Sequence, residues 1–164
     1  MTDEQLTQLS IRVGQQLLAR GETVTTAESC TGGWIAKVLT DIAGSSAWFH
    51  RGFVTYSNDA KQQMIGVSER SLAEYGAVSE PVVREMAQGA LREAAADFAI
   101  SVSGIAGPDG GSEEKPVGTV WFGFARAGGE VLAERYCFSG DREAVRRQAT
   151  ARALQTLLDR FLKN

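Results

Sequence analysis

The order in which helix-like and strand-like patterns follow one another constrains the fold of this chain more than any other feature. Apolar residues recur at helical spacing over residues 4–20, and a β-branched run at 23–27 follows directly. Further helix patterns cover 34–42, a short stretch that starts near 58, 79–96 and 142–162. Further strand patterns cover 52–56, 98–103, 118–125 and 130–138. Helices and strands therefore alternate first, and two strands follow each other directly near the end.

This order predicts the fold class. The last two strands meet at Gly128-Gly129, a pair of residues typical of a hairpin. Alternating helices and strands with a late hairpin predict an α/β fold, a three-layer α/β/α sandwich around a mixed β-sheet. The chain shows no internal repeat and no linker that would divide it, so we expect a single domain over residues 1–164.

Composition and charge narrow the classes of function. Of the 164 residues, 43% are hydrophobic and 23% are charged, which is typical of a globular protein with one core. The formal net charge is −3 and the pI is near 5.3. An acidic chain of this kind is not a general nucleic-acid binder, although a local basic pocket for one phosphate stays open. We therefore expect no nucleic-acid partner.

The sequence shows no pattern typical of a membrane span or of secretion. Its longest apolar stretches, such as 117–125, are too short and too rich in glycine to cross a bilayer. The first ten residues lack the basic and apolar regions of a secretory signal. The two cysteines, Cys30 and Cys137, are too few for a disulfide framework, so we expect reduced thiols and a cytoplasmic location.

The turn after the first strand is the first candidate site. It covers residues 28–33 and has the sequence ESCTGG. Open α/β sheets bind ligands at such strand-to-helix junctions, and the two glycines allow the backbone to approach a ligand closely. Unpaired N–H groups at the start of the next helix would stabilise the oxyanion formed when Ser29 attacks an amide carbonyl. The plainer alternative is that Ser29 and Thr31 only cap that helix.

Tyr56 and Lys61 form the second candidate. Asn58 is placed to cap a helix whose first turn contains Lys61, and a helix N-terminus disfavours a positive charge. Together with burial, this position would lower the pKa of Lys61 towards that of a general base. Tyr56, at the end of its strand, would relay a proton or hold the lysine. An exposed lysine beside a tyrosine at the rim of the sheet fits the same pattern.

Two later segments add candidate ligand contacts. The loop 103–116 is rich in glycine, which suggests close backbone approach to a ligand or a mobile lid, with a plain surface loop as the alternative. Arg142 and Arg146 lie four residues apart at the start of the last helix. They fit a phosphate clamp completed by the N–H groups of that helix, and they fit equally well as solvated charges paired with nearby acids.

Several common catalytic signatures are missing. His50 is the only histidine, and nothing places it near Ser29, so a Ser-His-Asp triad is not indicated. One histidine and two cysteines do not make a metal-ligand cluster, and neither a GxxxxGK[ST] nor a GxGxxG motif occurs. A serine activated by lysine is then the simplest route to acyl transfer. Cys30 is the rival nucleophile, although a small buried thiol is its more common state.

Six segments carry a family resemblance. They are TTAESCTGG (25–33), GSSAWFHRGFVTYSNDAK (44–61), GAVSEPVV (76–83), SVSGIAGPDGG (101–111), KPVGTVWFG (115–123) and CFSGDREAVRRQAT (137–150). The sequence closely resembles the CinA C-terminal domain family over nearly its whole length. Stand-alone bacterial members of that family are nicotinamide-nucleotide amidohydrolases. Larger members carry an additional N-terminal domain that resembles molybdopterin-binding proteins, which these 164 residues do not include.

The resemblance implies an activity and its residues. The reaction is the deamidation of nicotinamide mononucleotide to nicotinic acid mononucleotide and ammonia, a step of pyridine-nucleotide (NAD) salvage. The implied nucleophile is Ser29, and a neutral Lys61 would take its proton directly or through Tyr56. The expected substrate-binding residues are Cys30, Thr31, Gly32, Gly33, Ser46, Ser103, Gly104 and Arg142, the last for the phosphate. No metal and no cofactor is required.

Alternatives stay open at this point. The same glycine-rich turns and arginines would serve a nucleotide-binding or regulatory module without catalysis. An amidase that uses Cys30 is a further alternative. The chemistry runs through a covalent ester or through a water held by the serine, and both routes use the same three residues. Small enzymes of this size are often symmetric dimers, so we expect a homodimer.

Overall fold

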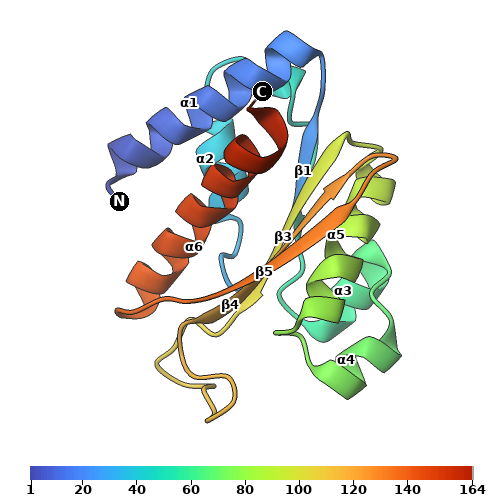
Figure 1. Ribbon diagram of the computed structural model, residues 1–164, viewed down its shortest axis with the longest axis vertical. Coiled ribbons are helices and arrows are strands. Elements are labelled where there is room, and N and C mark those ends of the chain that lie inside the picture. The colour runs from blue at the N-terminus through green and yellow to red at the C-terminus, as the bar shows by residue number, and fades with distance from the viewer. Residues whose placement is uncertain (164) are drawn as a thin grey trace.

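The computed structural model describes residues 1–163 and has five strands flanked by helices (Figure 1). The strands are β1 (Val24–Glu28), β2 (Phe53–Val54), β3 (Phe98–Gly104), β4 (Thr119–Arg126) and β5 (Val131–Cys137). The helices are α1 (Asp3–Arg20), α2 (Trp34–Thr40), α3 (Asn58–Ile65), α4 (Glu69–Tyr75), α5 (Glu80–Ala94) and α6 (Arg142–Leu157), with short helical turns η1 (Ser45–Ala47) and η2 (Leu158–Leu162). None of these helices, up to residue 163, has both the length and the apolar character needed to cross a membrane.

The sheet is mixed, as predicted. Its strand order is β2-β1-β3-β4-β5; β1 runs parallel to β2 and β3, whereas β3, β4 and β5 pair antiparallel. The hairpin between β4 and β5 turns at Gly128, whose φ of +70° favours glycine. Because β1 and β3 are parallel neighbours, their carboxyl ends lie side by side at one edge of the sheet.

Helices cover both faces of the sheet and complete the predicted three-layer sandwich (Figure 1). α1, α2 and α6 lie on one face, and α3, α4 and α5 lie on the other. The central strand β3 shows how the faces differ. Phe98, Ile100 and Val102 point to the α6 side, whereas Ala99 packs on the α5 side and Ser101 donates to the carbonyl of Val83 in α5. Small side chains on that face let α5 lie close to the sheet.

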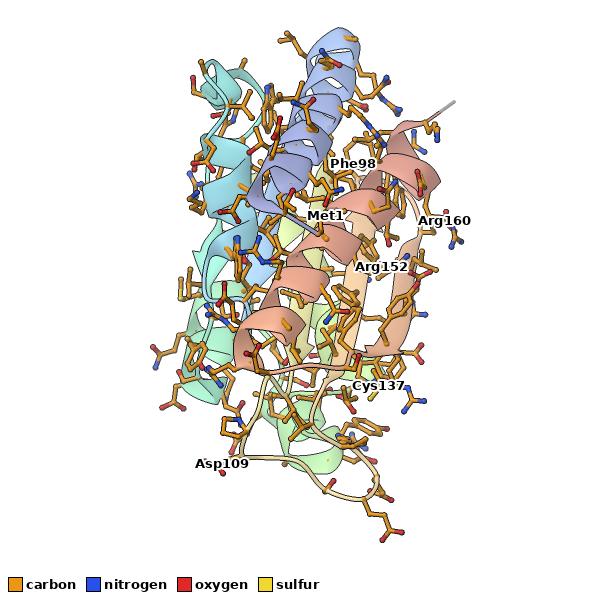
Figure 2. The ribbon with its side chains drawn as sticks, turned by 90° about the vertical axis from the view of Figure 1, so that its left-hand side faces the viewer. Met1, Phe98, Asp109, Cys137, Arg152 and Arg160 are labelled. Carbon is orange, nitrogen blue, oxygen red and sulfur yellow. The ribbon has the colours of Figure 1, made fainter. Side chains whose placement is uncertain are left out.

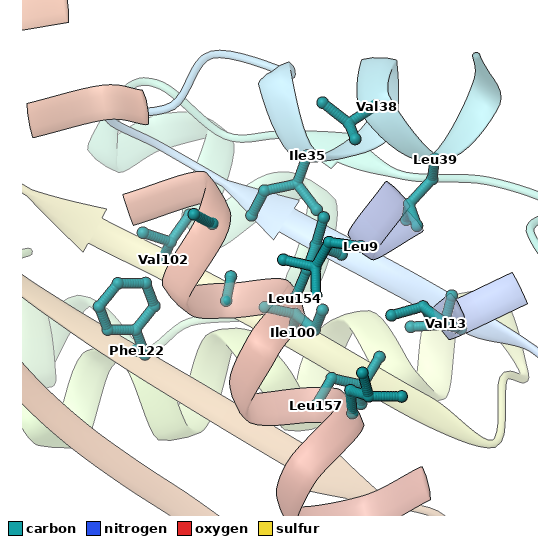
Figure 3. Packing of buried hydrophobic residues seen from close by; sticks show 14 of the residues in the cluster. Leu9, Val13, Ile35, Val38, Leu39, Ile100, Val102, Phe122, Leu154 and Leu157 are labelled. Carbon is teal, nitrogen blue, oxygen red and sulfur yellow. The ribbon is translucent and has the colours of Figure 1, made fainter. Parts of the chain in front are cut away.

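The larger core fills the space between β3 and the helices α1, α2 and α6. Leu9 and Val13 of α1, Ile35 of α2 and Leu154 of α6 converge on Ile100 (Figure 3). Each such buried side chain contributes about 1.5–3 kcal/mol relative to exposure. Since Ile35 is the second residue of α2, its burial also fixes the turn between β1 and α2.

Some local predictions were wrong. The structure adds α4, a helix that the sequence analysis did not predict because Leu72 is its only buried residue and no apolar period is visible. β2 is reduced to two residues, because only Phe53 and Val54 pair with β1. Ser57, not Asn58, caps α3 by accepting the N–H of Ala60.

The position of α3 against α5 gives the first testable prediction. A methyl group added to Gly89 of α5 would overlap the carbonyl oxygen of Ile65, the last residue of α3. We expect Gly89→Ala to lower the free energy of unfolding by about 2 kcal/mol or more, although alanine is the better helix former by about 1 kcal/mol. Chemical denaturation measures the change. The neighbouring exposed Gln88→Ala serves as the control and should stay within about 0.5 kcal/mol of the wild type. An unchanged or raised stability of Gly89→Ala would contradict this packing.

Candidate active site

Ser29 lies at the carboxyl edge of the parallel strands. It directly follows Glu28, the last residue of β1, and its N–H donates to the carbonyl of Val102 in β3 at 3.0 Å. This bond continues the pairing of β1 with β3, so Ser29 comes next to Ser103 and Gly104. Ligands bind in α/β sheets at this edge. The backbone pairing thus delivers three of the predicted site residues to one place.

A cavity of about 300 Å³ opens at this edge. Its size is at the lower end of the range for small-molecule pockets, ~300–1,000 Å³. Its walls come from the turns after β1 and β2, the start of α3, the loop after α4, the loop after β3 and the start of α6. Figure 2 shows Asp109 on the loop after β3. The lining residues are Ser29, Cys30, Tyr56, Asn58, Lys61, Ala77, Val78, Ser103, Gly104, Ile105, Ala106, Gly107, Asp109, Gly110 and Arg142. Across residues 1–163, no group of three or more His, Cys, Asp or Glu side chains gathers in a way that would hold a metal ion.

Lys61 reaches Ser29 from α3. Its Nζ lies 3.0 Å from the Oγ of Ser29 and donates to the carbonyl of Thr55 at 2.8 Å. The side chain is only 1% exposed, and no ion pair among the described residues includes it. Burial is the main cause that lowers the pKa of Lys61 from 10.5 to about 8. A lysine with this pKa is substantially neutral at mildly alkaline pH and accepts a proton from a neighbouring hydroxyl.

Cys30 lines the same cavity but in a different electrostatic state. Its side chain is buried, and burial is the main cause that raises the pKa of the thiol to about 12. A nucleophilic cysteine needs a lowered thiol pKa. Cys30 is therefore protonated at neutral pH, which disfavours the thiol as the attacking group.

Tyr56 and Arg142 meet across the mouth of the cavity. The hydroxyl of Tyr56 accepts from Arg142 Nη2 at 2.9 Å, and Arg142 Nη1 donates to the carbonyl of Gly107 at 2.8 Å. Tyr56 is 60% exposed, and no hydrogen bond within residues 1–163 joins its hydroxyl to Lys61. Arg142 has no carboxylate partner in the described part of the chain, so its charge is available to an anionic ligand.

Four predicted contacts do not line this cavity. Thr31, Gly32 and Gly33 lie on the far side of the turn, where they line a second hollow with Trp34, Lys37, Arg146 and Arg147. Ser46 is exposed in η1, close to the start of β1, where the N–H of Val24 donates to the carbonyl of Trp48. The structure therefore puts Ser46 at the opposite end of β1 from Ser29.

Glu28 is a residue of the site that the sequence analysis missed. Its buried carboxylate accepts the N–H groups of Ile35 and Ala36 at 2.9 Å each, and the hydroxyl of Thr31 at 2.6 Å. Burial raises the pKa of this carboxyl group, partly offset by these hydrogen bonds. The first N–H groups of α2 were expected to be free for a ligand, but Glu28 takes two of them. An acid that ends an otherwise uncharged strand just before the ESCTGG serine was the available signal.

Arg146 follows neither of the two alternatives left open for it, a phosphate clamp with Arg142 or a solvated charge paired with an acid. Its guanidinium turns to the backbone of the turn after β1. Nε donates to the carbonyl of Cys30 at 3.0 Å and Nη2 donates to the carbonyl of Thr31 at 3.2 Å. Of the two arginines, only Arg142 lines the cavity.

Fold and site together define a small α/β protein with a buried serine–lysine pair at the ends of parallel strands. The chain belongs to the CinA C-terminal domain family, whose sequence profile matches residues 6–161. It is 76% identical over 164 residues to the nicotinamide-nucleotide amidohydrolase PncC of Escherichia coli strain K12, covering 100% of this chain and 99% of that protein. It is 53% identical over 153 residues to the protein of the same name from Pseudomonas putida, covering 93% and 95%.

Solved structures of the same superfamily share the fold. The competence/damage-inducible protein CihA of Agrobacterium tumefaciens superimposes with a TM-score of 0.92 at 45% identity, covering 96% of this chain and 95% of that chain. The competence damage-inducible protein A of Klebsiella pneumoniae gives a TM-score of 0.91 at 44% identity, covering 94% and 96%. The predicted family and fold are confirmed.

The burial of Lys61 predicts a stability effect with a defined pH dependence. At pH 7 the folded chain must keep the buried lysine charged although its pKa is lowered, and this lowers the free energy of unfolding by about 3 kcal/mol. Lys61→Met removes this cost but leaves the carbonyl of Thr55 without its donor, worth ~1–2 kcal/mol. We expect the variant to be about 1–2 kcal/mol more stable than the wild type at pH 7 in urea denaturation.

The pH dependence separates charge from packing. Below pH 8 both folded and unfolded lysine are charged, so the full cost applies. As the pH rises from about 8 towards 10.5, the folded lysine is neutral while the unfolded one still binds a proton, so the wild type gains stability relative to Lys61→Met. The advantage of the variant should therefore shrink between pH 7.5 and 10. Lys37→Met, at an exposed lysine paired with Asp41, is the control without such an advantage. A variant advantage that does not change with pH would contradict the charge-based explanation.

Proposed function

We propose that this protein hydrolyses the carboxamide of nicotinamide mononucleotide, releasing ammonia and nicotinic acid mononucleotide, with Ser29 as nucleophile. The observation that carries the proposal is the 3.0 Å approach of Lys61 Nζ to Ser29 Oγ, with the lysine pKa lowered to about 8. The names of the relatives from Escherichia coli and Pseudomonas putida point to a nicotinamide nucleotide as substrate. The reaction is amide hydrolysis, and the proposal assigns its steps to this chain's own residues.

The first half of the reaction forms an acyl-enzyme. Neutral Lys61 takes the proton of Ser29 as the oxygen attacks the carboxamide carbon. Negative charge develops on the carbonyl oxygen, and the N–H of Cys30, a residue that lines the cavity beside Ser29, stabilises it. When the C–N bond breaks, Lys61 returns the proton to the leaving nitrogen, and ammonia departs.

The second half repeats the same steps with water. Lys61, neutral again, takes a proton from a water molecule that attacks the ester carbon of the acyl-enzyme. The ester bond breaks, the proton goes to Ser29, and the carboxylic acid product leaves after losing its own proton to solvent. Tyr56 acts at the other end of the substrate, where its hydroxyl bonds Arg142.

Arg142 provides the contact for the phosphate. It is the one arginine that lines the cavity, and it has no carboxylate partner among the described residues. Its bonds to Gly107 and Tyr56 hold the guanidinium at the cavity wall and leave further N–H donors for an anion. Binding energy from the phosphate then helps to orient the amide at Ser29.

Three wider expectations belong to the same proposal. The product is a pyridine nucleotide, so the reaction has its place in NAD salvage. The protein works in the cytoplasm without metal or cofactor. It forms a homodimer, for which light scattering of the purified protein is the direct measurement.

Two alternatives are less well supported. The raised pKa of Cys30 argues against a cysteine amidase. A binding module without catalysis has no need of a buried lysine that lies against a serine, because the charge costs stability. Tight nucleotide binding without ammonia release would favour that second alternative.

The proposal predicts which side chains turnover needs. Ammonia release from nicotinamide mononucleotide, measured with a chelator present, should fall to background in Ser29→Ala. It should fall by ~10²–10⁴-fold in Lys61→Ala, as for loss of a general base. Cys30→Ala is the matched control and should keep at least about a third of wild-type turnover, because its backbone N–H is unchanged. A Lys61→Ala protein that folds and turns over at nearly the wild-type rate would contradict the role of Lys61 as the general base.

The phosphate contact predicts a difference between two substrates. Arg142→Ala should lower kcat/KM for nicotinamide mononucleotide by about 10–100-fold, the effect of losing a charge-assisted hydrogen bond. The same variant should treat nicotinamide riboside, which lacks the phosphate, within about threefold of the wild type. Equal losses on both compounds would show that Arg142 shapes the cavity and does not bind the phosphate.

A further inference from the structure

Arg146 forms hydrogen bonds to the backbone on the outer side of the turn that carries Ser29. Its Nε and Nη2 donate to the carbonyls of Cys30 and Thr31, at 3.0 and 3.2 Å. The guanidinium carbon lies 5.7 Å from the ring centre of Trp34, and a methyl group at Gly32 would come within 3.3 Å of Nη2. The arginine therefore lies directly against the backbone, and the position of Gly32 leaves room for it.

The two carbonyls that Arg146 holds share their peptide groups with the N–H groups of Thr31 and Gly32. In a trans peptide the C=O and N–H bonds point in opposite directions. When Arg146 fixes the carbonyl of Cys30, it also directs the N–H of Thr31 away from itself. When it fixes the carbonyl of Thr31, it likewise orients the N–H of Gly32, which donates to the carbonyl of Ser29 at 3.0 Å.

These bonds form a chain that ends at Cys30. Arg146 polarises the Thr31–Gly32 peptide, whose N–H bonds the carbonyl of Ser29. That carbonyl belongs to the peptide whose N–H is on Cys30, a residue that lines the cavity beside Ser29. Hydrogen bonds in series strengthen one another, and a charged donor at the start of the series strengthens it most. The terminal N–H of the chain is thus a better donor to an anion than an isolated amide.

We propose that Arg146 is a positioning residue that orients and polarises the Cys30 amide as the donor for the oxyanion. The inference rests on the proposed function of Ser29 as a nucleophile. Arg146 does not touch the substrate, because it lies in the second hollow on the opposite side of the turn from the cavity. Glu28 holds the same turn from within, through Thr31 and the start of α2.

Arg147 provides a matched control. Its guanidinium carbon lies 5.0 Å from the ring centre of the same Trp34. Its side-chain partners are different, however, because it pairs with Asp3 and Glu143 and makes no bond to the turn. Arg146→Ala and Arg147→Ala therefore remove the same charge from neighbouring places, and only the first releases the two carbonyls.

The experiment compares kcat and KM for nicotinamide mononucleotide in the two variants. We expect Arg146→Ala to lower kcat by about 10–100-fold with KM within threefold, less than the ~10²–10³-fold typical of losing an oxyanion donor itself. Arg147→Ala should keep kcat within threefold. Arg146→Lys should recover little, because an ammonium group cannot bond both carbonyls as a guanidinium does. Added guanidinium, which has access through the second hollow, should raise kcat of Arg146→Ala at least threefold and leave Arg147→Ala unchanged.

A second substrate keeps this inference separate from the choice of nucleotide. Acetylation of Ser29 by p-nitrophenyl acetate, followed by intact mass, needs the oxyanion donor but no nucleotide. If the wild type releases no ammonia yet Arg146→Ala slows acetylation at least tenfold, the proposed substrate fails and the inference about Arg146 stands. Acetylation and ammonia release at wild-type rates in Arg146→Ala would overturn the inference. So would an equal loss of kcat in Arg147→Ala, since the effect would then come from the shared packing on Trp34.

Discussion

The buried ammonium group of Lys61 is the interaction on which the site depends. It lies against Ser29 and the carbonyl of Thr55, with no carboxylate to balance it among residues 1–163. A protein interior tolerates such a group because its pKa falls, and the same fall gives the lysine the basicity that proton transfer near neutral pH needs. Gly89 lets α5 lie close against the end of α3, the helix that carries Lys61. The burial of Lys61 is thus the cause both of the loss of stability and of the proposed basicity.

Glu28 is a second buried ionisable group, but unlike Lys61 its role is to hold the backbone. Its carboxylate is satisfied by two backbone N–H groups and the hydroxyl of Thr31, so it acts as an internal cap for α2. The turn that carries Ser29 is thereby held on both sides, by Glu28 from within and by Arg146 from without. The side chain of Ser29, on so short a turn, keeps its direction only if the backbone around it cannot move.

The fold could be predicted because apolar residues recur at helix and strand spacing along the chain. Part of the site could be predicted because the ESCTGG motif begins at the end of β1. Ser29 and Lys61 meet, as the sequence analysis expected, since strand pairing and one helix cap suffice to bring them together. The direction of the Arg146 side chain could not be predicted. Arg146 lies one helical turn after Arg142, but the way α6 packs points its side chain to the carbonyl of Cys30 and that of Arg142 to Gly107. Ser46 illustrates the same difficulty, since the path of the chain places its loop at the opposite end of β1 from Ser29. Tertiary packing sets these directions, and no local pattern encodes them.

The walls of the cavity come from segments spread from Ser29 to Arg142 along the chain. This spread has a consequence during synthesis on the ribosome. A growing chain that has released α3 but not yet α6 already holds both Ser29 and Lys61, but it has neither the cavity wall at Arg142 nor the outer support at Arg146. Closing a long loop to form such contacts carries an entropic cost. The cavity is therefore complete only when the last helix has docked against the sheet.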